Sequence, residues 1–293
     1  MGTSCIVERR AQYAGFETRE LAVAGSGPTI VLVHGFGHAS QAWRQVLDLL
    51  HDAGQAAVAV DLPGFGGADP LSAGELVPQL DTFLAEVIRR YGGAEGAVVV
   101  GNSLGAAMAA RMGRDSALPI LAVMALDIAG ITWKPLVSAG LPVAIAASGP
   151  LTKIPYPHRA RAAVAERLLE RSLARLLYGR KSAVDPAVVA DLASSAPDTV
   201  EARRLMRLGA RFKTELDRAG DHGGVRVPMV VVHGANDRLV PVSSSRILHE
   251  ANPGSRLVVL PRIGHCPQLD APTVISRLAL ELAGIPNDKR ATS

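Results

Sequence analysis

Residues Ala97–Gly105 read AVVVGNSLG, an apolar run that leads into a Gly-x-Ser-x-Gly motif. The valines predict a buried strand, and the alanine-rich stretch that begins at Leu104 predicts a helix. Gly101 and Gly105 leave space for a tight turn between the two elements, so that Ser103 projects from the end of the strand. The N-terminus of the helix favours negative charge at that point. This stretch therefore predicts a nucleophilic serine on a strand-to-helix turn of an α/β fold.

Five further apolar runs of similar length lie outside this stretch: Thr29–Val33, Ala56–Val60, Ile120–Leu126, Met229–Val232 and Leu257–Leu260. They are apolar on both faces, which is typical of central strands in a parallel sheet. Segments with helical periodicity alternate with them: Trp43 to Leu50 after an expected N-cap at Ser40, Leu76 to Ile88, a helix after Val242, and one from about Thr273 to Ala283. The alternation predicts a doubly wound, mostly parallel sheet with its chemistry at the carboxyl ends of the strands.

The alternation stops between residues 131 and 224. Pro-rich loops and two helix-like segments, Ala160–Leu177 and Val200–Leu216, replace it there. We therefore expect a sheet domain made of residues 1–130 and 225–293, with a helical insertion at 131–224. The formal charges divide in the same way, because the insertion has a net charge of +6 and the remainder −2. The basic character of the chain is thus a property of the insertion.

The composition excludes several classes of protein. Aromatic residues make up 4% of the chain, and none of its basic stretches is interleaved with aromatics, so we expect no nucleic-acid partner. Cys5 and Cys266 lie at opposite ends without any CxxC or Cys/His spacing, which argues against a disulfide framework and a structural metal. Met1–Arg10 lacks the apolar stretch of a secretory signal, and prolines and glycines interrupt the uncharged run Pro135–Thr152. These features predict a cytoplasmic protein.

A serine hydroxyl needs a base to take its proton, and His265 is the best placed of the eight histidines. It lies in the loop Ile263–Pro267, directly after the last predicted strand. His34 and His233 stand at strand ends beside glycines, and we expect them to be hydrogen-bonded into loops. The other five histidines have no supporting pattern.

A third residue should orient His265 and stabilise its imidazolium. Asp237 follows the predicted strand Met229–Val232 and precedes His265 by 28 residues, which favours it for this role. Asp127, at the end of an earlier strand, is the alternative. Asp61 also ends a strand, but the turn Leu62–Gly66 that follows it indicates a structural role.

An acyl-transfer site also needs two backbone N–H groups that stabilise the oxyanion. Leu104, directly after the serine, is expected to supply one of them. The loop His34-Gly35-Phe36-Gly37 follows the first predicted parallel strand, and we expect the N–H of Phe36 to be the other.

Five segments in this order resemble the α/β-hydrolase fold family. They are HGFG at 34–37, DLPGFG at 61–66, the serine turn at 101–105, GANDRLVP at 234–241 and GHCPQLDAP at 264–272. The chain departs from the family pattern at Asp270, where Glu is usual, and at Ala106, where many members have Gly. The resemblance implies that residues 131–224 form a helical cap over the active site and that the reaction needs neither a metal nor an organic cofactor.

A serine at this turn favours attack on an ester through an acyl-enzyme, so the sequence predicts a carboxylic-ester hydrolase, esterase- or lipase-like, for small-molecule esters with an apolar acyl or alcohol part. Asn102 before the serine suggests an alternative, a carbon–carbon bond hydrolase of vinylogous diketones. Such enzymes tend to have a Gly-Pro-containing oxyanion loop and an aromatic residue after the histidine. This chain has Gly37-His38 in the loop and Cys266 after the histidine. A non-catalytic, ligand-binding member of the fold is a third possibility.

The insertion permits one more hypothesis. The apolar segment Pro135–Leu151 precedes a stretch with arginines at 159, 161, 167, 171 and 175, a combination found in lids that contact lipid surfaces. A cap packed on the sheet domain, with its arginines solvated or paired to Glu166 and Glu170, explains the same pattern more simply.

Overall fold

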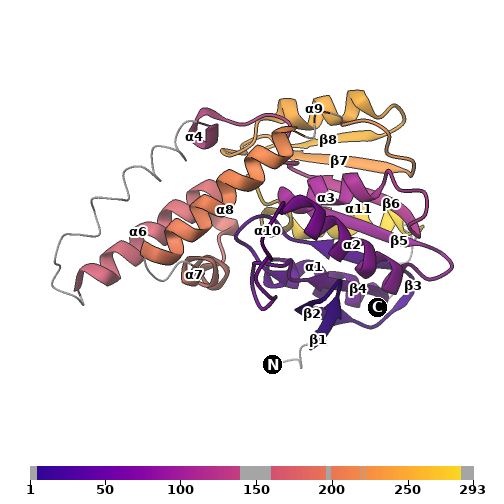
Figure 1. The fold of residues 1–293 in the computed structure, drawn as a ribbon, viewed down its shortest axis with the longest axis horizontal. Coiled ribbons are helices and arrows are strands. Elements are labelled where there is room, and N and C mark those ends of the chain that lie inside the picture. The colour runs from indigo at the N-terminus through magenta and orange to yellow at the C-terminus, as the bar shows by residue number, and fades with distance from the viewer. Residues whose placement is uncertain (1–4, 139–159, 196–198, 219, 221, 285–293) are drawn as a thin grey trace.

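The computed structural model describes residues 5–138, 160–195, 199–218, 220 and 222–284. Its sheet has eight strands in the order β1-β2-β4-β3-β5-β6-β7-β8 (Figure 1). The strands from β3 to β8 are mutually parallel, and the β1–β2 hairpin pairs antiparallel with β4 at one edge. The strand bounds are β1 Val7–Tyr13, β2 Phe16–Val23, β3 Ser26–Val33, β4 Gln55–Val60, β5 Ala97–Asn102, β6 Ile120–Leu126, β7 Met229–Gly234 and β8 Arg256–Leu260. The predicted α/β fold with a mostly parallel, doubly wound sheet is confirmed.

The β1–β2 hairpin is the part of the sheet that the sequence analysis missed. Strand β1 is mostly exposed and carries charged residues at positions 8, 9 and 10, so it lacks the apolar run that reveals the central strands. Charged side chains on an edge strand protect it against pairing with other chains. Ala14 and Gly15 connect the two strands with φ values of 51° and 82°, the left-handed geometry of a tight hairpin turn.

Helices cover both faces of the sheet. On one face, α1 (Arg44–Asp52) and α11 (Pro272–Leu282) pack in a cluster with Ile30 and Leu32 of β3. On the other, α2 (Val77–Gly92), α3 (Leu104–Met112) and α9 (Val242–Ala251) pack in a cluster with Val31 and Val33. Alternate side chains of one strand thus enter two cores, which explains why the strand is apolar throughout.

The expected N-cap at Ser40 is wrong. Ser40–Trp43 forms a short 3₁₀ turn, η1, and α1 begins only at Arg44. The backbone N–H of Ser40 donates a hydrogen bond of 2.6 Å to Asp61, which also accepts bonds from Gly67 N–H and Arg19 Nε. Because Asp61 binds the chain before α1, Ser40 is held by a distant carboxylate and does not cap the helix itself. These contacts agree with the structural role expected for Asp61.

Residues 131–224 contain only helices and connections in the part that the structure describes. They include α4 (Pro135–Ser138), α6 (Ala160–Leu177), η2 (Lys181–Ala183), α7 (Pro186–Ser194) and α8 (Thr199–Arg218). Helices α6 and α8 extend beyond the sheet (Figure 1). The C-terminal part of α8 is anchored to the core, because Glu215 accepts hydrogen bonds from the N–H groups of Leu76 and Val77 at the start of α2. Most of the apolar segment Pro135–Leu151 lies outside the described residues.

No described helix combines the length and the apolar character that crossing a membrane requires.

The turn at Ser103 has the tight geometry that its glycines predict. Ser103 has φ 55° and ψ −110°, values that a non-glycine residue rarely adopts. A Cβ atom at Gly101 would lie 2.1 Å from the carbonyl oxygen of Gly105, and one at Gly105 would lie 2.3 Å from that of Val33. Both glycines therefore allow backbone segments to approach each other more closely than any side chain permits.

We expect Gly105→Ala to lower the free energy of unfolding by about 1–3 kcal/mol or more, because the methyl group meets rigid backbone. Urea denaturation of purified protein measures this loss. Gly113→Ala, at the other end of α3, is the matched control, because its Cβ would contact side-chain methyl groups of Val123 and Val225 at 3.0 and 3.1 Å. Equal stability of Gly105→Ala and the wild-type protein would contradict the tight turn described here.

Candidate active site

Ser103 lies where β5 ends and α3 begins, at the carboxyl edge of the sheet. Its side chain borders a cavity of about 480 Å³ between the sheet and the helices of residues 131–224. His265, Phe36 and Leu104 line the same cavity. The structure thus brings four of the five residues singled out from the sequence to one space, although they are distant in the chain.

His265 and Asp237 are joined by a short hydrogen bond. His265 lies in the loop between β8 and α10 (Pro267–Asp270), and Asp237 in the loop after β7. His265 Nδ1 is 2.7 Å from Asp237 Oδ2, and both side chains are buried. Because the carboxylate occupies Nδ1, the Nε2 atom is the one left for other chemistry.

Asp237 is held as a carboxylate. Its Oδ1 atom accepts hydrogen bonds of 2.7 and 3.0 Å from the backbone N–H groups of Leu239 and Val240. Burial by itself would raise the pKa of Asp237, but the neighbouring His265 and these hydrogen bonds outweigh it and lower the pKa to about 2. The group that faces His265 therefore remains negatively charged at all ordinary pH values.

The loop of residues 34–37 approaches the serine turn closely. A Cβ atom at Gly35 would lie 3.1 Å from the Cβ of Ser103, so only glycine fits there without displacing the serine. Among the described residues, no hydrogen bond involves the backbone N–H of Phe36 or of Leu104. Both predicted oxyanion donors are thus in the cavity wall and available to a ligand.

Asn102 fixes the loop that carries His265. The amide of Asn102 donates a hydrogen bond of 3.0 Å to the carbonyl oxygen of His265, and its Oδ1 accepts one of 3.1 Å from Gln268. The sequence analysis interpreted Asn102 only as a possible sign of carbon–carbon bond hydrolysis. Its contacts instead give it a positioning role, which could not be seen in the sequence because its partners lie more than 160 residues away.

Asp270 binds the same loop from the other side. Its Oδ2 accepts hydrogen bonds of 2.7 Å from Gly264 N–H and 2.6 Å from Gly179 N–H. The first bond orders the residue before His265, and the second ties that loop to the chain that follows α6. Aspartate performs this double task here, so the usual Glu is not needed at this position.

Three further histidines are buried near the site. His34 accepts a hydrogen bond from Leu62 N–H and donates one to the Gly35 carbonyl, as expected for a structural residue. His233 contacts Ser245 Oγ of α9 at 2.8 Å, and its Nε2 lies 3.3 Å from the carbonyl oxygen of Val240 in the loop before that helix, which is the kind of loop contact expected for it. His38, for which the sequence gave no signal, lines the cavity, and burial lowers its pKa to about 3. His38 is therefore a neutral, weakly polar part of the wall.

Apolar side chains from residues 131–224, most of them in helices, form much of the cavity wall. The set includes Trp133, Val137, Leu176, Leu177, Leu205, Met206, Phe212 and Leu216. Phe212 of α8 also belongs to an aromatic group with Phe36 and Phe65, whose ring centroids lie 5.2–6.3 Å apart. This group joins α8 to the loop that carries the Phe36 N–H, so the wall and the oxyanion donor share one packing unit.

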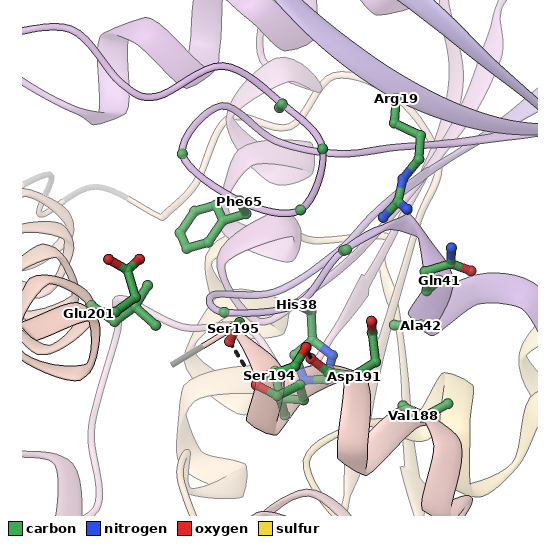
Figure 2. A pocket seen from close by; sticks show the side chains of 18 of the residues that line it. Arg19, His38, Gln41, Ala42, Phe65, Val188, Asp191, Ser194, Ser195 and Glu201 are labelled. Carbon is green, nitrogen blue, oxygen red and sulfur yellow. Dashed lines mark hydrogen bonds between the residues drawn. The ribbon is translucent and has the colours of Figure 1, made fainter. Parts of the chain in front are cut away.

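A second cavity of about 570 Å³ adjoins the first, with His38 and Leu205 in the walls of both. Its lining is more polar: Figure 2 shows Arg19 and Gln41 on one side and Asp191, Ser194, Ser195 and Glu201 from the α7 and α8 region on the other. Arg19 is paired through Nε with Asp61 Oδ2 at 2.9 Å. The site thus has an apolar compartment beside Ser103 and a polar one next to it.

Asp127, Asp237 and His265 are the described residues that come closest to a metal site, with one potential ligand atom of each within 4.8 Å of the others. Asp237 and His265 already bind each other, and Asp127 Oδ1 accepts a hydrogen bond from Gly234 N–H at 2.9 Å. We therefore interpret the group as a hydrogen-bonded cluster of titratable side chains.

The model of the "Alpha/beta hydrolase family" matches residues 30–278. A solved serine hydrolase involved in carbazole degradation superimposes with a TM-score of 0.71 at 22% identity, over 95% of this chain and 99% of that one. At this identity the superposition establishes the fold alone.

Among curated proteins, a pimeloyl-[acyl-carrier protein] methyl ester esterase of Vibrio atlanticus is 28% identical, over 84% of this chain and 90% of its own. A 2-hydroxy-6-oxononadienedioate/2-hydroxy-6-oxononatrienedioate hydrolase of Cupriavidus pinatubonensis is 24% identical, over 87% and 86%. The dihydrolipoyllysine-residue acetyltransferase component of the acetoin cleaving system of Cupriavidus necator is 27% identical over 89% of this chain, but the match spans only 64% of that protein. The relatives thus include one named as an ester hydrolase and one named as a hydrolase of oxo-dicarboxylates.

Proposed function

We propose that this chain, which belongs to the alpha/beta hydrolase family, is a serine hydrolase that cleaves carboxylic esters through an acyl-enzyme. The observation that carries the proposal is the 2.7 Å bond between His265 Nδ1 and Asp237 Oδ2 behind a cavity that Ser103 and His265 both line. This arrangement supports roles for Ser103 as nucleophile, His265 as general base and acid, and Asp237 as the group that orients His265. None of these roles requires a metal or an organic cofactor.

In the proposed reaction, Ser103 Oγ attacks the ester carbonyl while His265 Nε2 takes its proton. The oxyanion that forms accepts hydrogen bonds from the N–H groups of Phe36 and Leu104. The carbonyl then reforms, the bond to the alcohol breaks, and His265 gives its proton to the leaving alcohol. A water molecule, deprotonated by His265, attacks the acyl-enzyme and releases the acid with Ser103 restored.

We further propose that residues 131–224 act as a cap on a core formed by residues 1–130 and 225–293. The support is that α4, α6 and α8 contribute side chains to the cavity beside Ser103, while Glu215 and Asp270 join those helices to the core. The cap therefore supplies most of the surface that the apolar part of a substrate would touch.

The two compartments suggest how an ester would lie. The apolar wall around Ser103 favours an aliphatic or aromatic acyl chain, and the polar cavity beyond His38 and Leu205 suits the more polar alcohol part. A panel of nitrophenyl esters from acetyl to decanoyl tests this arrangement. We expect kcat/KM to rise with acyl length until the apolar cavity is full and then to fall.

We expect Met206→Trp, which adds bulk to the wall of the apolar cavity, to shift the preferred acyl chain to a shorter length. Ser195→Trp is the matched control, because Ser195 lines only the polar cavity, and it should leave the acyl preference unchanged. The same panel measures both variants. If both variants shift the preference equally, or neither does, the acyl chain does not occupy the apolar cavity.

A second candidate function is hydrolysis of a carbon–carbon bond in a vinylogous diketone. One sequence relative is named as a 2-hydroxy-6-oxononadienedioate/2-hydroxy-6-oxononatrienedioate hydrolase, and Asn102 precedes the serine here. A diketone substrate run beside the ester panel distinguishes the two functions. Turnover of the diketone with a higher kcat/KM than every ester would replace the ester proposal with this one.

A further inference from the structure

Asp127 is a buried acid that the proposed reaction does not use. It directly follows β6, has φ 47°, and its side chain is completely buried. It lies against His233 and Asp237. His233 Nε2 is 3.5 Å from Asp127 Oδ1 and 3.6 Å from Asp237 Oδ2. Two carboxyl groups thus share one buried space beside His265.

The two oxygen atoms of Asp127 have different surroundings. Oδ1 accepts a hydrogen bond of 2.9 Å from Gly234 N–H. Oδ2 is buried, and no donor among the described residues reaches it. An ionised oxygen in that position would have lost its water without gaining a hydrogen bond, which is strongly unfavourable. A proton on the carboxyl group removes the charge, and with it this cost, if an acceptor for its hydrogen is near.

Asp237 offers an acceptor in the same buried space, because Asp237 Oδ2 and Asp127 Oδ1 lie 3.6 and 3.5 Å from the same atom, His233 Nε2. One carboxyl oxygen of each aspartate lies within the 4.8 Å that encloses the cluster with His265. Burial raises the pKa of Asp127 well above its usual value, and the negative charge of Asp237 and a hydrogen bond between the two carboxyl groups raise it further. The pKa of Asp237 is lowered, so the two acids divide into one neutral group and one carboxylate.

The groups around Asp127 do not supply a positive charge that would reverse this division. Burial lowers the pKa of His233 to about 4, so this ring is neutral near pH 7. Asp270, from the chain after β8, raises the pKa of Asp127 through its negative charge. Burial raises the pKa of the Cys266 thiol, which therefore carries no charge. Lys134 donates a hydrogen bond to the backbone carbonyl of Asp237, and His265 is bound to the side chain of Asp237.

We propose that Asp127 is a neutral carboxylic acid that donates a hydrogen bond to the Asp237 carboxylate and so positions this carboxylate against His265. Asp127 is a positioning residue, because it acts through Asp237 and touches no substrate. The proposal rests on the proposed function only in its kinetic consequences. The protonation of Asp127 itself is independent of which substrate the protein cleaves.

Two variants separate the hydrogen bond from the charge. Asp127→Asn keeps a neutral donor at the same place and tolerates a positive φ, whereas Asp127→Gly tolerates the φ but removes the donor. We expect Asp127→Asn to keep kcat/KM within about 3-fold of the wild-type value. Asp127→Gly should lose about 10- to 100-fold in kcat with little change in KM, because a misplaced Asp237 weakens the base. Similar losses in both variants would contradict the proposal.

Melting temperatures test the protonation of Asp127 without an activity assay. A group whose folded pKa is raised contributes stability that is present below its unfolded pKa of about 4 and lost as the pH rises. We therefore expect Asp127→Asn and the wild-type protein to have nearly the same melting temperature below about pH 4. As the pH rises toward neutral, the melting temperature of Asp127→Asn should exceed that of the wild-type protein by a growing margin. A wild-type protein that gains stability over Asp127→Asn as the pH rises would show that Asp127 is ionised and would overturn the proposal. This result would leave the ester hydrolase proposal untouched.

Discussion

Ester hydrolysis will fall by at least about 10⁴-fold in kcat when Ser103 is replaced by alanine, because the covalent route is then closed and only binding and the oxyanion donors remain. The fold should survive this change. Ser103 is already held at φ 55° by the backbone around it, and alanine removes only the hydroxyl group. The measurement is kcat for the best nitrophenyl ester, with circular dichroism to verify the fold.

Ser116→Ala is the matched control for this experiment, because Ser116 is exposed and lines neither cavity. It should retain kcat within about 3-fold of the wild-type value, as surface substitutions away from the chemistry usually do. If Ser103→Ala retains more than a few per cent of wild-type kcat, the nucleophile lies elsewhere.

Asp237→Asn will also be severe, with an expected loss of about 10³- to 10⁴-fold in kcat near pH 7. An amide in place of the carboxylate would present a hydrogen to His265 Nδ1 or to the N–H groups of Leu239 and Val240, so one of these bonds must break. The imidazole would then favour the wrong tautomer, and the imidazolium would lose its negative partner. Asp48→Asn, at an exposed position of α1 that lines neither cavity, is the control and should be nearly silent.

The same variant makes a prediction about acid stability. The folded pKa of Asp237, about 2, lies below the usual value of an aspartate, so its contribution to stability is present above about pH 4 and is lost as the pH falls toward 2. Melting temperatures of the wild-type protein and Asp237→Asn should therefore differ most near neutral pH and converge near pH 2. A difference that widens on acidification would contradict the assignment of Asp237 as the buried carboxylate.

The central sheet was predictable from the sequence because burial on both faces gives its strands uninterrupted apolar runs, as in Ile120–Leu126, which matches β6 residue for residue. The hairpin at Val7–Val23 was not, since most of β1 is exposed to water and charged residues interrupt any apolar run in both of its strands. The position of Ser40 was misjudged for a related reason. Its partner, the Asp61 carboxylate, comes from a different part of the chain, and a local capping pattern cannot reveal that.

The candidate site was predictable where strand ends define it. Ser103, Asp237 and His265 follow strands whose carboxyl ends meet at one edge of the sheet, so their meeting follows from the topology. The supporting contacts do not follow from it. Asn102 and Asp270 act on the loop of His265 through side-chain bonds, and the state of Asp127 depends on the distance between two buried carboxyl groups. These features depend on the final packing, which no local sequence pattern encodes.

The most direct test of the account is the site of covalent labelling by a fluorophosphonate, read by the intact mass of the protein and by peptide mapping. This reagent reacts with a serine that a neighbouring base activates, whatever the natural substrate. The account predicts one adduct per folded chain, on Ser103, and none in Ser103→Ala. A folded wild-type protein that remains unlabelled, or an adduct on another residue, would contradict it.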